Sequence, residues 1–156
     1  MANLNWSTVF SAKGAGNITV SAKTEGLGDF QKVVQSMDSV VRSSRDGLLT
    51  ILHTAAPEKS GALRRGIVAS TSAEKTATPG KVVYDIYMDD AMNDIFVKYA
   101  ASGKRYYYPA SQEYGFRLKN GGYKPGKYYM RDTTIRYAAA FEKDMTAGMD
   151  KALEAL

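Results

Sequence analysis

The sequence contains no cysteine and only one histidine, His53. The absence of cysteine excludes a disulfide framework, a thiolate zinc site and a cysteine nucleophile. A single imidazole excludes any metal site with two histidine ligands and leaves one side chain for general-base work near neutral pH. No phosphate-binding glycine loop and no paired-carboxylate motif stands in a recognisable setting. We therefore expect no enzymatic activity, no cofactor and no bound metal.

Long hydrophobic runs are also missing. No apolar stretch approaches the ~20 residues that span a bilayer. The first ten residues, MANLNWSTVF, lack the basic region and apolar core of a secretion signal. We expect a soluble protein that is not secreted and has no membrane partner. The 156 residues suit one domain, and 44% hydrophobic residues are enough to bury a core.

A long amphipathic helix is expected from Asp29 to about Thr54, because its apolar residues recur at intervals of three and four. The pair Ser43-Ser44 and the nearby Gly47 loosen this pattern, which favours a break in the helix, with one end projecting or meeting a partner. The polar side of the helix is expected in solvent and carries Lys32, Gln35, Asp38, Arg42 and Arg45.

A small antiparallel sheet is expected beside this helix. Residues 18–22, 67–72 and 82–88 are rich in β-formers, and a Thr-Pro-Gly turn at 78–80 joins the last two segments into a hairpin. One face of that hairpin must pack on the long helix, since a lone hairpin is marginally stable in water. A second long helix begins near Tyr128. The expected class is α+β: a small antiparallel sheet packed against a long amphipathic helix, with a second long C-terminal helix.

Shorter elements are expected between these. Residues 91–99 suit a short helical turn, a second short helix ends at Gly115, and residues 116–118 suit a strand. Residues 1–17 are expected as an N-terminal arm or a loose edge strand, ahead of a single domain over 18–156. Within that arm, Trp6 and Phe10 are candidate anchors on the domain or on a neighbouring molecule.

Charge is unevenly distributed along the chain. The net charge is +5, but residues 98–136 hold nine cations against two acids, which is +7, so the remainder sums to −2. Most of the 11 tyrosines lie in the same stretch. Cations interleaved with aromatic residues are typical of nucleic-acid contacts, of surfaces that bind anionic partners and of polar protein interfaces.

Four acids and no cation occur between residues 85 and 94. Three interpretations remain open for this segment. It could hold a divalent ion through carboxylate oxygens, although the spacing lacks a calcium-loop pattern. It could be a solvated turn, or it could meet the +7 stretch of a neighbouring copy, because head-to-tail contacts join two different patches of one chain. The four acids are Asp85, Asp89, Asp90 and Asp94.

The tyrosines of the basic stretch have three possible roles. They could stack on bases, pack in the core or contact a partner, and an interface suits tyrosine because it combines contact area with a polar tip. The interface candidates in this stretch are Lys104, Arg105, Tyr106, Tyr107, Tyr108, Glu113, Tyr114, Tyr128 and Tyr129.

Four further charged or titratable residues each have alternatives. Arg64 and Arg65 could face a channel that carries DNA, or form ion pairs with Glu58 in a solvated loop. Glu113 could be a buried ion-pair partner that fixes its loop. His53 is expected at a helix end or in the core, because no nucleophile accompanies it.

Three motifs of the sequence are recognisable together. They are ITVSAKTEGLGDFQKVV, APEKSGALRRGI, and QEYGF followed by KPGKYYMRDTTIRYAAAFEKDM. In this order and spacing they resemble the tail-completion or neck proteins of tailed bacteriophages, over roughly residues 18–156. The sequence departs from the simple family pattern in the arm 1–17 and in a longer acidic and tyrosine-rich stretch at 88–108.

The resemblance implies a small α+β domain that assembles into a homo-oligomeric, hexameric ring at the head–tail junction of a virion. It implies contacts with the head-closure or connector protein and with the tail terminator or tail tube, around DNA that passes without sequence-specific binding. It implies no catalysis. Two alternatives stay open: the terminator ring that caps the tail tube, and a basic nucleic-acid-binding protein that uses residues 98–136.

Overall fold

The computed structural model describes residues 2–10, 16–24, 30–73 and 81–154, and through residue 34 it describes the backbone alone. The elements in chain order are β1 (Ala2–Phe10), β2 (Gly16–Thr24), α1 (Phe30–Ala55), α2 (Ala62–Gly66), β3 (Ile67–Ala69), β4 (Lys81–Met88), the 3-10 turn η1 (Asp90–Met92), α3 (Asn93–Phe96), β5 (Val97–Tyr99), β6 (Arg105–Tyr107), α4 (Tyr108–Tyr114), β7 (Gly115–Arg117), β8 (Tyr123–Pro125) and α5 (Tyr129–Glu154).

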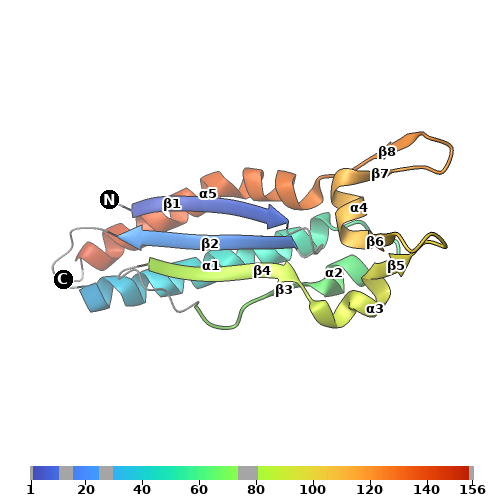
Figure 1. The fold of residues 1–156 in the computed structure, drawn as a ribbon. Helices are drawn as coiled ribbons and strands as arrows, with labels where there is room; N and C mark the ends of the chain where they lie inside the picture. Colours follow the sequence, from blue (N-terminus) through green and yellow to red (C-terminus); the bar gives the residue numbers. More distant parts are fainter. Residues whose placement is uncertain (1, 11–15, 25–29, 74–80, 155–156) are drawn as a thin grey trace.

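The fold is α+β in two layers (Figure 1). An antiparallel sheet of order β1-β2-β4-β3 forms one layer, and the long helices α1 and α5 form the other. Helix α1 packs on β4 and β3 and against α5. The expected class and the expected second long helix are thus confirmed. The turn at 78–80 and Asp29, the expected start of the long helix, lie outside the described residues.

The N-terminal residues form part of the sheet. Strand β1 is an edge strand, and each of its residues pairs antiparallel with β2, Trp6 opposite Val20. In turn β2 pairs with β4, Val20 opposite Tyr84. Of the two expected forms for this region, the structure therefore has the edge strand. Trp6 and Phe10 lie on β1, and their side chains are outside what the structure describes.

Helix α1 is continuous from Phe30 to Ala55, so the expected break at Ser43-Ser44 and Gly47 is wrong. The reason is close packing with α5: a Cβ at Gly47 would lie 2.6 Å from the Tyr137 hydroxyl oxygen. Glycine is there because the partner helix needs the space, and docking against α5 outweighs its low helix propensity. A second close approach of the two helices occurs at Gly148 of α5, where a Cβ would overlap the Val40 side chain of α1.

The core lies between α1, β4, α2 and α5. On β4 the alternate residues Tyr84, Ile86 and Met88 are buried, and Val83 on the opposite face is buried too. The largest fully buried side chains are Tyr84, Phe96, Phe141, Met37, Leu48, Leu52, Leu63, Ile67, Ile86, Met88 and Met130.

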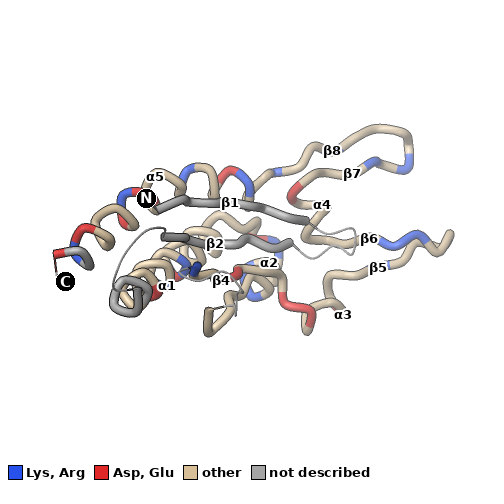
Figure 2. The backbone as a smooth tube through the Cα atoms, turned by 60° about the vertical axis from the view of Figure 1, so that its left-hand side comes forward, with Lys and Arg blue, Asp and Glu red and all other residues tan. Residues whose placement is uncertain are grey.

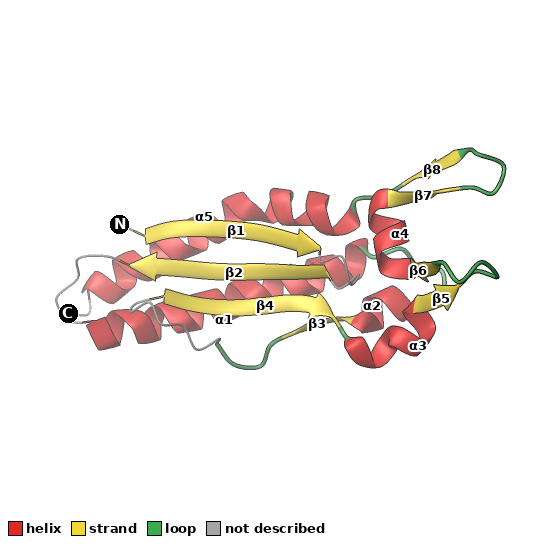
Figure 3. Ribbon diagram, in the orientation of Figure 1, coloured by secondary structure: helices red, strands yellow, loops and turns green. Residues whose placement is uncertain are grey.

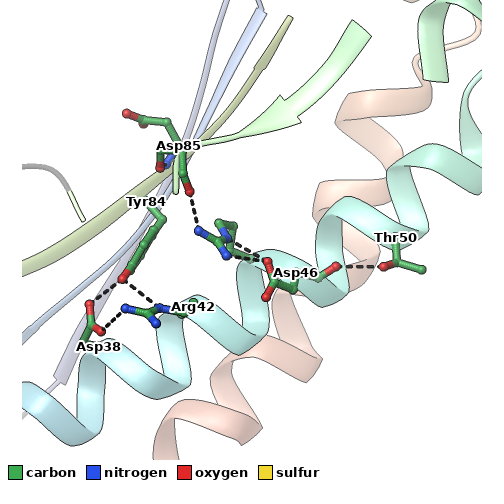
Figure 4. A network of polar contacts seen from close by, with 8 residues as sticks. Asp38, Arg42, Asp46, Thr50, Tyr84 and Asp85 are labelled. Atoms are coloured by element: carbon green, nitrogen blue, oxygen red, sulfur yellow. Dashed lines mark hydrogen bonds and ion pairs between the residues drawn. The ribbon is translucent and has the colours of Figure 1, made fainter. Parts of the chain in front are cut away.

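A polar network joins α1 to β4 (Figure 4). The buried Tyr84 hydroxyl donates to Asp38 at 2.6 Å and accepts from Arg42 at 3.2 Å. Arg45 is only 8% exposed, lies 4.8 Å from the Tyr84 ring centroid and donates to the Ser70 carbonyl. The expectation that Asp38, Arg42 and Arg45 belong to a solvated helix face is therefore wrong for Arg45, because its side chain is buried between α1 and the sheet.

Candidate interaction groove

Two small hairpins extend from one end of the molecule, opposite the end where β1 begins and α5 finishes (Figures 1 and 3). One pairs β5 with β6 and the other pairs β7 with β8. A groove of about 1100 Å³ lies where these hairpins meet α4 and residues 57–59 of the loop after α1. We call it the hairpin groove. It is lined by Pro57, Glu58, Lys59, Phe96, Lys98, Tyr99, Ala100, Ala101, Ser102, Tyr106, Tyr108, Ser111, Gln112, Phe116, Arg117, Leu118, Lys119, Lys124 and Lys127.

The charge of the hairpin groove is almost entirely positive. Its one acid, Glu58, is in an ion pair with Arg64 and is therefore already neutralised. Both hairpins carry cations, as the blue segments of Figure 2 show, and Lys59 and Lys127 lie in the loops beside them. None of the groove cations is ion-paired within the part of the chain that the structure describes. The groove cations are Lys59, Lys98, Arg117, Lys119, Lys124 and Lys127.

Aromatic and apolar side chains separate these cations. Tyr99 is 70% exposed and Leu118 is 43% exposed, so both present apolar surface to solvent. Lys124 lies 5.9 Å from the Phe116 ring centroid, within the range of a cation–π interaction. Exposed apolar surface ringed by unpaired charge is typical of a binding surface.

Glu113 fixes the position of the second hairpin. Its side chain is fully buried, and its two carboxylate oxygens accept the backbone N–H groups of Met130 at 2.9 Å and Arg131 at 3.0 Å. These donors belong to the first turn of α5, where N–H groups have no partner inside the helix. Burial raises the pKa of Glu113, an effect that the two N–H donors partly offset. Glu113 was expected to be buried in an ion pair, and its acceptor role at a helix end differs from that expectation.

The backbone repeats this connection between α4 and the start of α5. Lys127 N–H donates to the Gln112 carbonyl at 2.8 Å, and Tyr128 N–H donates to the Glu113 carbonyl at 3.0 Å. At Gly126 a Cβ would overlap the Glu113 carbonyl oxygen, so no larger residue fits. The segments QEYGF and KPGKYYM, which are separate in the sequence, therefore pack directly against each other.

Gly115, where α4 gives way to β7, has a φ of 87° and a ψ of −178°. Only glycine adopts this conformation readily, because it has no Cβ. The helix therefore ends where expected. A Cβ at Gly115 would also overlap the Lys124 carbonyl oxygen of β8.

The tyrosines expected at an interface divide into two groups. Tyr107 and Tyr129 are buried, at 7% and 5% exposure, and they belong to the core together with Glu113. Tyr106 and Tyr114 are exposed, whereas Tyr108 and Tyr128 are half-buried. The interface prediction is therefore wrong for the two buried tyrosines and for Glu113, because the docking of α4 on α5 encloses them.

Cations of the basic stretch stack on its tyrosines. Arg131 lies 3.8 Å from the Tyr128 ring centroid, and Lys104 lies 5.6 Å from that of Tyr106. Arg105 stacks on Tyr107 at 5.5 Å. Lys104 and Arg105 are exposed, so these pairs leave both charges accessible to a partner.

The acidic segment is divided in two by the fold. Asp85 lies on β4 and is half-buried, with its backbone N–H donating to the Ser70 hydroxyl. Asp89, Asp90 and Asp94 lie around η1 and α3, and we call these three residues the acidic face. Asp89 caps η1 by accepting from the Ala91 N–H at 3.0 Å, while Asp90 and Asp94 are exposed.

Arg64, Arg65 and His53 hold the loop after α1. Arg64 pairs with Glu58 and donates to the His53 carbonyl at 2.9 Å, and Arg65 donates to the Ser60 carbonyl at 3.2 Å. The His53 ring nitrogen Nε2 lies 2.7 Å from the Ile67 carbonyl oxygen, which joins the end of α1 to β3. Both arginines are exposed, so Arg64 forms the expected ion pair with Glu58 while the side chains of both residues remain accessible to solvent.

Within the described residues, no group of three or more acidic or histidine side chains is arranged to hold a metal ion. None of the described helices is long and apolar enough to cross a membrane. Comparison of the chain with protein-family models, with curated proteins and with solved structures gives no match.

Proposed function

We propose that this chain is a structural subunit of a bacteriophage head–tail junction, which connects the head-closure complex to the tail around the DNA channel. The observation that supports this proposal is the composition of the hairpin groove. Residues 57–59 come from the second of the three resembling motifs, and Gln112, Phe116, Lys124 and Lys127 come from the third. Segments separated by about fifty residues thus line one charged surface, as a binding function would require.

The geometry favours assembly as the use of this surface. The groove is wide and rimmed by long cationic side chains, and it combines exposed tyrosine and leucine with charges that pair with no described residue. Those features suit a protein partner, since interfaces are enriched in aromatic residues and surrounded by polar rims. In the proposed role, ring contacts and contacts with the head-closure protein or the tail use the hairpin end, and DNA passes without sequence-specific binding.

Electron microscopy tests the proposal directly. The chain is mixed with its head-closure and tail neighbours, and the reconstituted junction is imaged with a gold label on the chain. A ring of label at the junction is the expected result, and absence of label from the junction would end the proposal. A ring that remains on isolated tails lacking heads would instead support the alternative role as tail terminator.

A second candidate function rests on the cations of the hairpin groove, which are not ion-paired with described residues. In this alternative the groove binds nucleic acid through phosphate contacts, with Tyr99 and Tyr106 available for stacking. Titration of DNA affinity against salt separates the two functions. Tight binding at physiological salt with a steep salt dependence favours nucleic acid, and negligible binding favours the junction subunit.

A further inference from the structure

We infer that the hairpin groove of one subunit binds the acidic face of a second copy of this chain. The contact deepens the proposed function, on which it rests for its biological setting, by naming the two surfaces through which copies would join. It is heterologous, meaning that each copy uses its groove toward one neighbour and its acidic face toward the other.

Charge complementarity is the first argument. The groove presents six cations, Lys59, Lys98, Arg117, Lys119, Lys124 and Lys127, with its single acid neutralised by Arg64. The acidic face presents three carboxylates and has no described ion pair. Residues 88–97 contain no cation, so the segment that carries the acidic face has only negative side chains among its charged residues. Opposite fields of this kind speed encounter and fix the register of association.

Apolar complementarity is the second argument. Ile95 follows Asp94 on α3 and is 49% exposed, so a large apolar side chain protrudes beside the carboxylates. The groove offers the matching surface in Tyr99, Phe116 and Leu118. An apolar anchor entering an apolar groove, with charges pairing around it, is the usual anatomy of a protein interface.

The relative placement of the two surfaces is the third argument. The β5–β6 hairpin lies between them, with α3 on one side and the β7–β8 hairpin on the other (Figures 1 and 3). One molecule therefore cannot bring its own acidic face into its own groove. A second copy, displaced along the line from α3 to the β7–β8 hairpin, can place its acidic face in the groove of the first. Repeating this contact from copy to copy gives a ring or a filament.

The test uses charge reversal on each surface separately. One variant carries Lys98→Glu and Lys119→Glu, one substitution in each hairpin, and the other carries Asp90→Lys and Asp94→Lys. Self-association is measured by sedimentation over a concentration series, at low and at high salt. Each variant alone is expected to lose self-association by about tenfold or more relative to the unmodified chain. Mixing the two variants in equal amounts is expected to restore it.

Restoration by mixing is specific to this interface. In the mixture the reversed groove meets the reversed acidic face, and the unmodified groove meets the unmodified acidic face, so complementary pairs alternate around an assembly. Matched controls reverse two exposed lysines or two exposed aspartates of α5, Lys143→Glu with Lys151→Glu and Asp144→Lys with Asp150→Lys. These controls are expected to associate like the unmodified chain, and circular dichroism checks that all variants are folded.

Three results would overturn the inference. The first is an unmodified chain that stays monomeric at every soluble concentration. The second is association that the groove variant and the acidic-face variant leave unchanged, or that mixing does not restore. The third is a groove variant that loses DNA binding while self-association is unaffected, which would assign the groove to nucleic acid.

Microscopy separates this failure from failure of the proposed function. If the chain is found at the head–tail junction but its self-association is unaffected by charge reversal, the proposed function stands and the inferred contact is wrong. If the chain associates through the hairpin groove and the acidic face but is absent from the junction, the inferred contact stands and the proposed function is wrong.

Discussion

The carboxylate of Glu113 accepts the backbone N–H of Met130 at 2.9 Å in a fully buried position. This hydrogen bond joins the end of α4 to the first turn of α5. Because the β7–β8 hairpin lies between these two helices in the chain, the same bond holds one wall of the hairpin groove.

Replacing Glu113 with alanine is expected to lower the free energy of unfolding by about 2–3 kcal/mol, because one buried and one partly buried N–H group lose their acceptor. Glu113→Gln should cost less, since the amide keeps one acceptor oxygen. Chemical denaturation measures both. Glu142→Gln, on an exposed position of α5, is the control and should change stability little. Equal stability of Glu113→Ala and the unmodified chain would contradict the capping role.

Two tyrosine-to-phenylalanine substitutions are expected to differ in their effect on stability. Tyr84→Phe removes a hydroxyl that bonds to Asp38 and Arg42, and should destabilise the protein by about 1–2 kcal/mol. Tyr129→Phe removes a buried hydroxyl that has no hydrogen-bond partner among the described residues, and should be neutral or slightly stabilising. Thermal and denaturant unfolding of the two variants gives the comparison, and a greater loss for Tyr129→Phe would refute it.

Gly126→Ala is expected to destabilise the protein by about 2 kcal/mol or more, because the added methyl group overlaps the Glu113 carbonyl and lies 2.5 Å from the Tyr114 carbonyl carbon. The control is Gly121→Ala in the β7–β8 turn. There the space is open but φ is +83°, so only a backbone cost of about 1 kcal/mol is expected. The ranking fails if the turn variant is the less stable of the two.

Alkaline pH is expected to destabilise the fold. Burial raises the pKa values of Tyr84, Tyr107 and Tyr129 above the ordinary 10.0. In the unfolded chain these phenols ionise near pH 10, whereas in the folded chain they stay neutral, so the unfolded state binds fewer protons above that pH. Their contribution to stability is therefore complete below pH 10 and is lost as the pH rises further. Part of the phenolate absorbance should appear only together with the loss of circular dichroism signal.

The layers of the fold could be predicted because they depend on patterns local in sequence. Apolar residues at helical spacing locate α1, and alternation puts Tyr84, Ile86 and Met88 on one face of β4, which the structure shows to be buried. The uninterrupted helix could not be predicted from its own residues. Gly47 weakens a helix in isolation, and only the Tyr137 side chain of α5 accounts for glycine at that position.

The hairpin groove, too, could be predicted only in part. Its charge was visible in the sequence as an excess of cations over residues 98–136, but the contribution of Pro57, Glu58 and Lys59 was not. Those residues reach the groove through the turn after α1, a tertiary placement without a local signal. The spacing of Asp38, Arg42 and Arg45 on one side of α1 was a usable sign of the Tyr84 network, since these positions are helical neighbours.

The bond between Glu113 and α5 has a consequence for the order of folding. The hairpin groove combines residues from 57 to 127. The segment after β8 is held on α4 by the N–H groups of Lys127 and Tyr128 and by the bonds from the first turn of α5 to Glu113. Such long-range contacts form late in folding, after the cost of closing the intervening chain has been met. A chain in which the first turn of α5 has not yet bonded to Glu113 therefore has an incomplete groove. In the proposed assembly this delay would act as a checkpoint, because partly folded copies would lack the surface needed to join a ring.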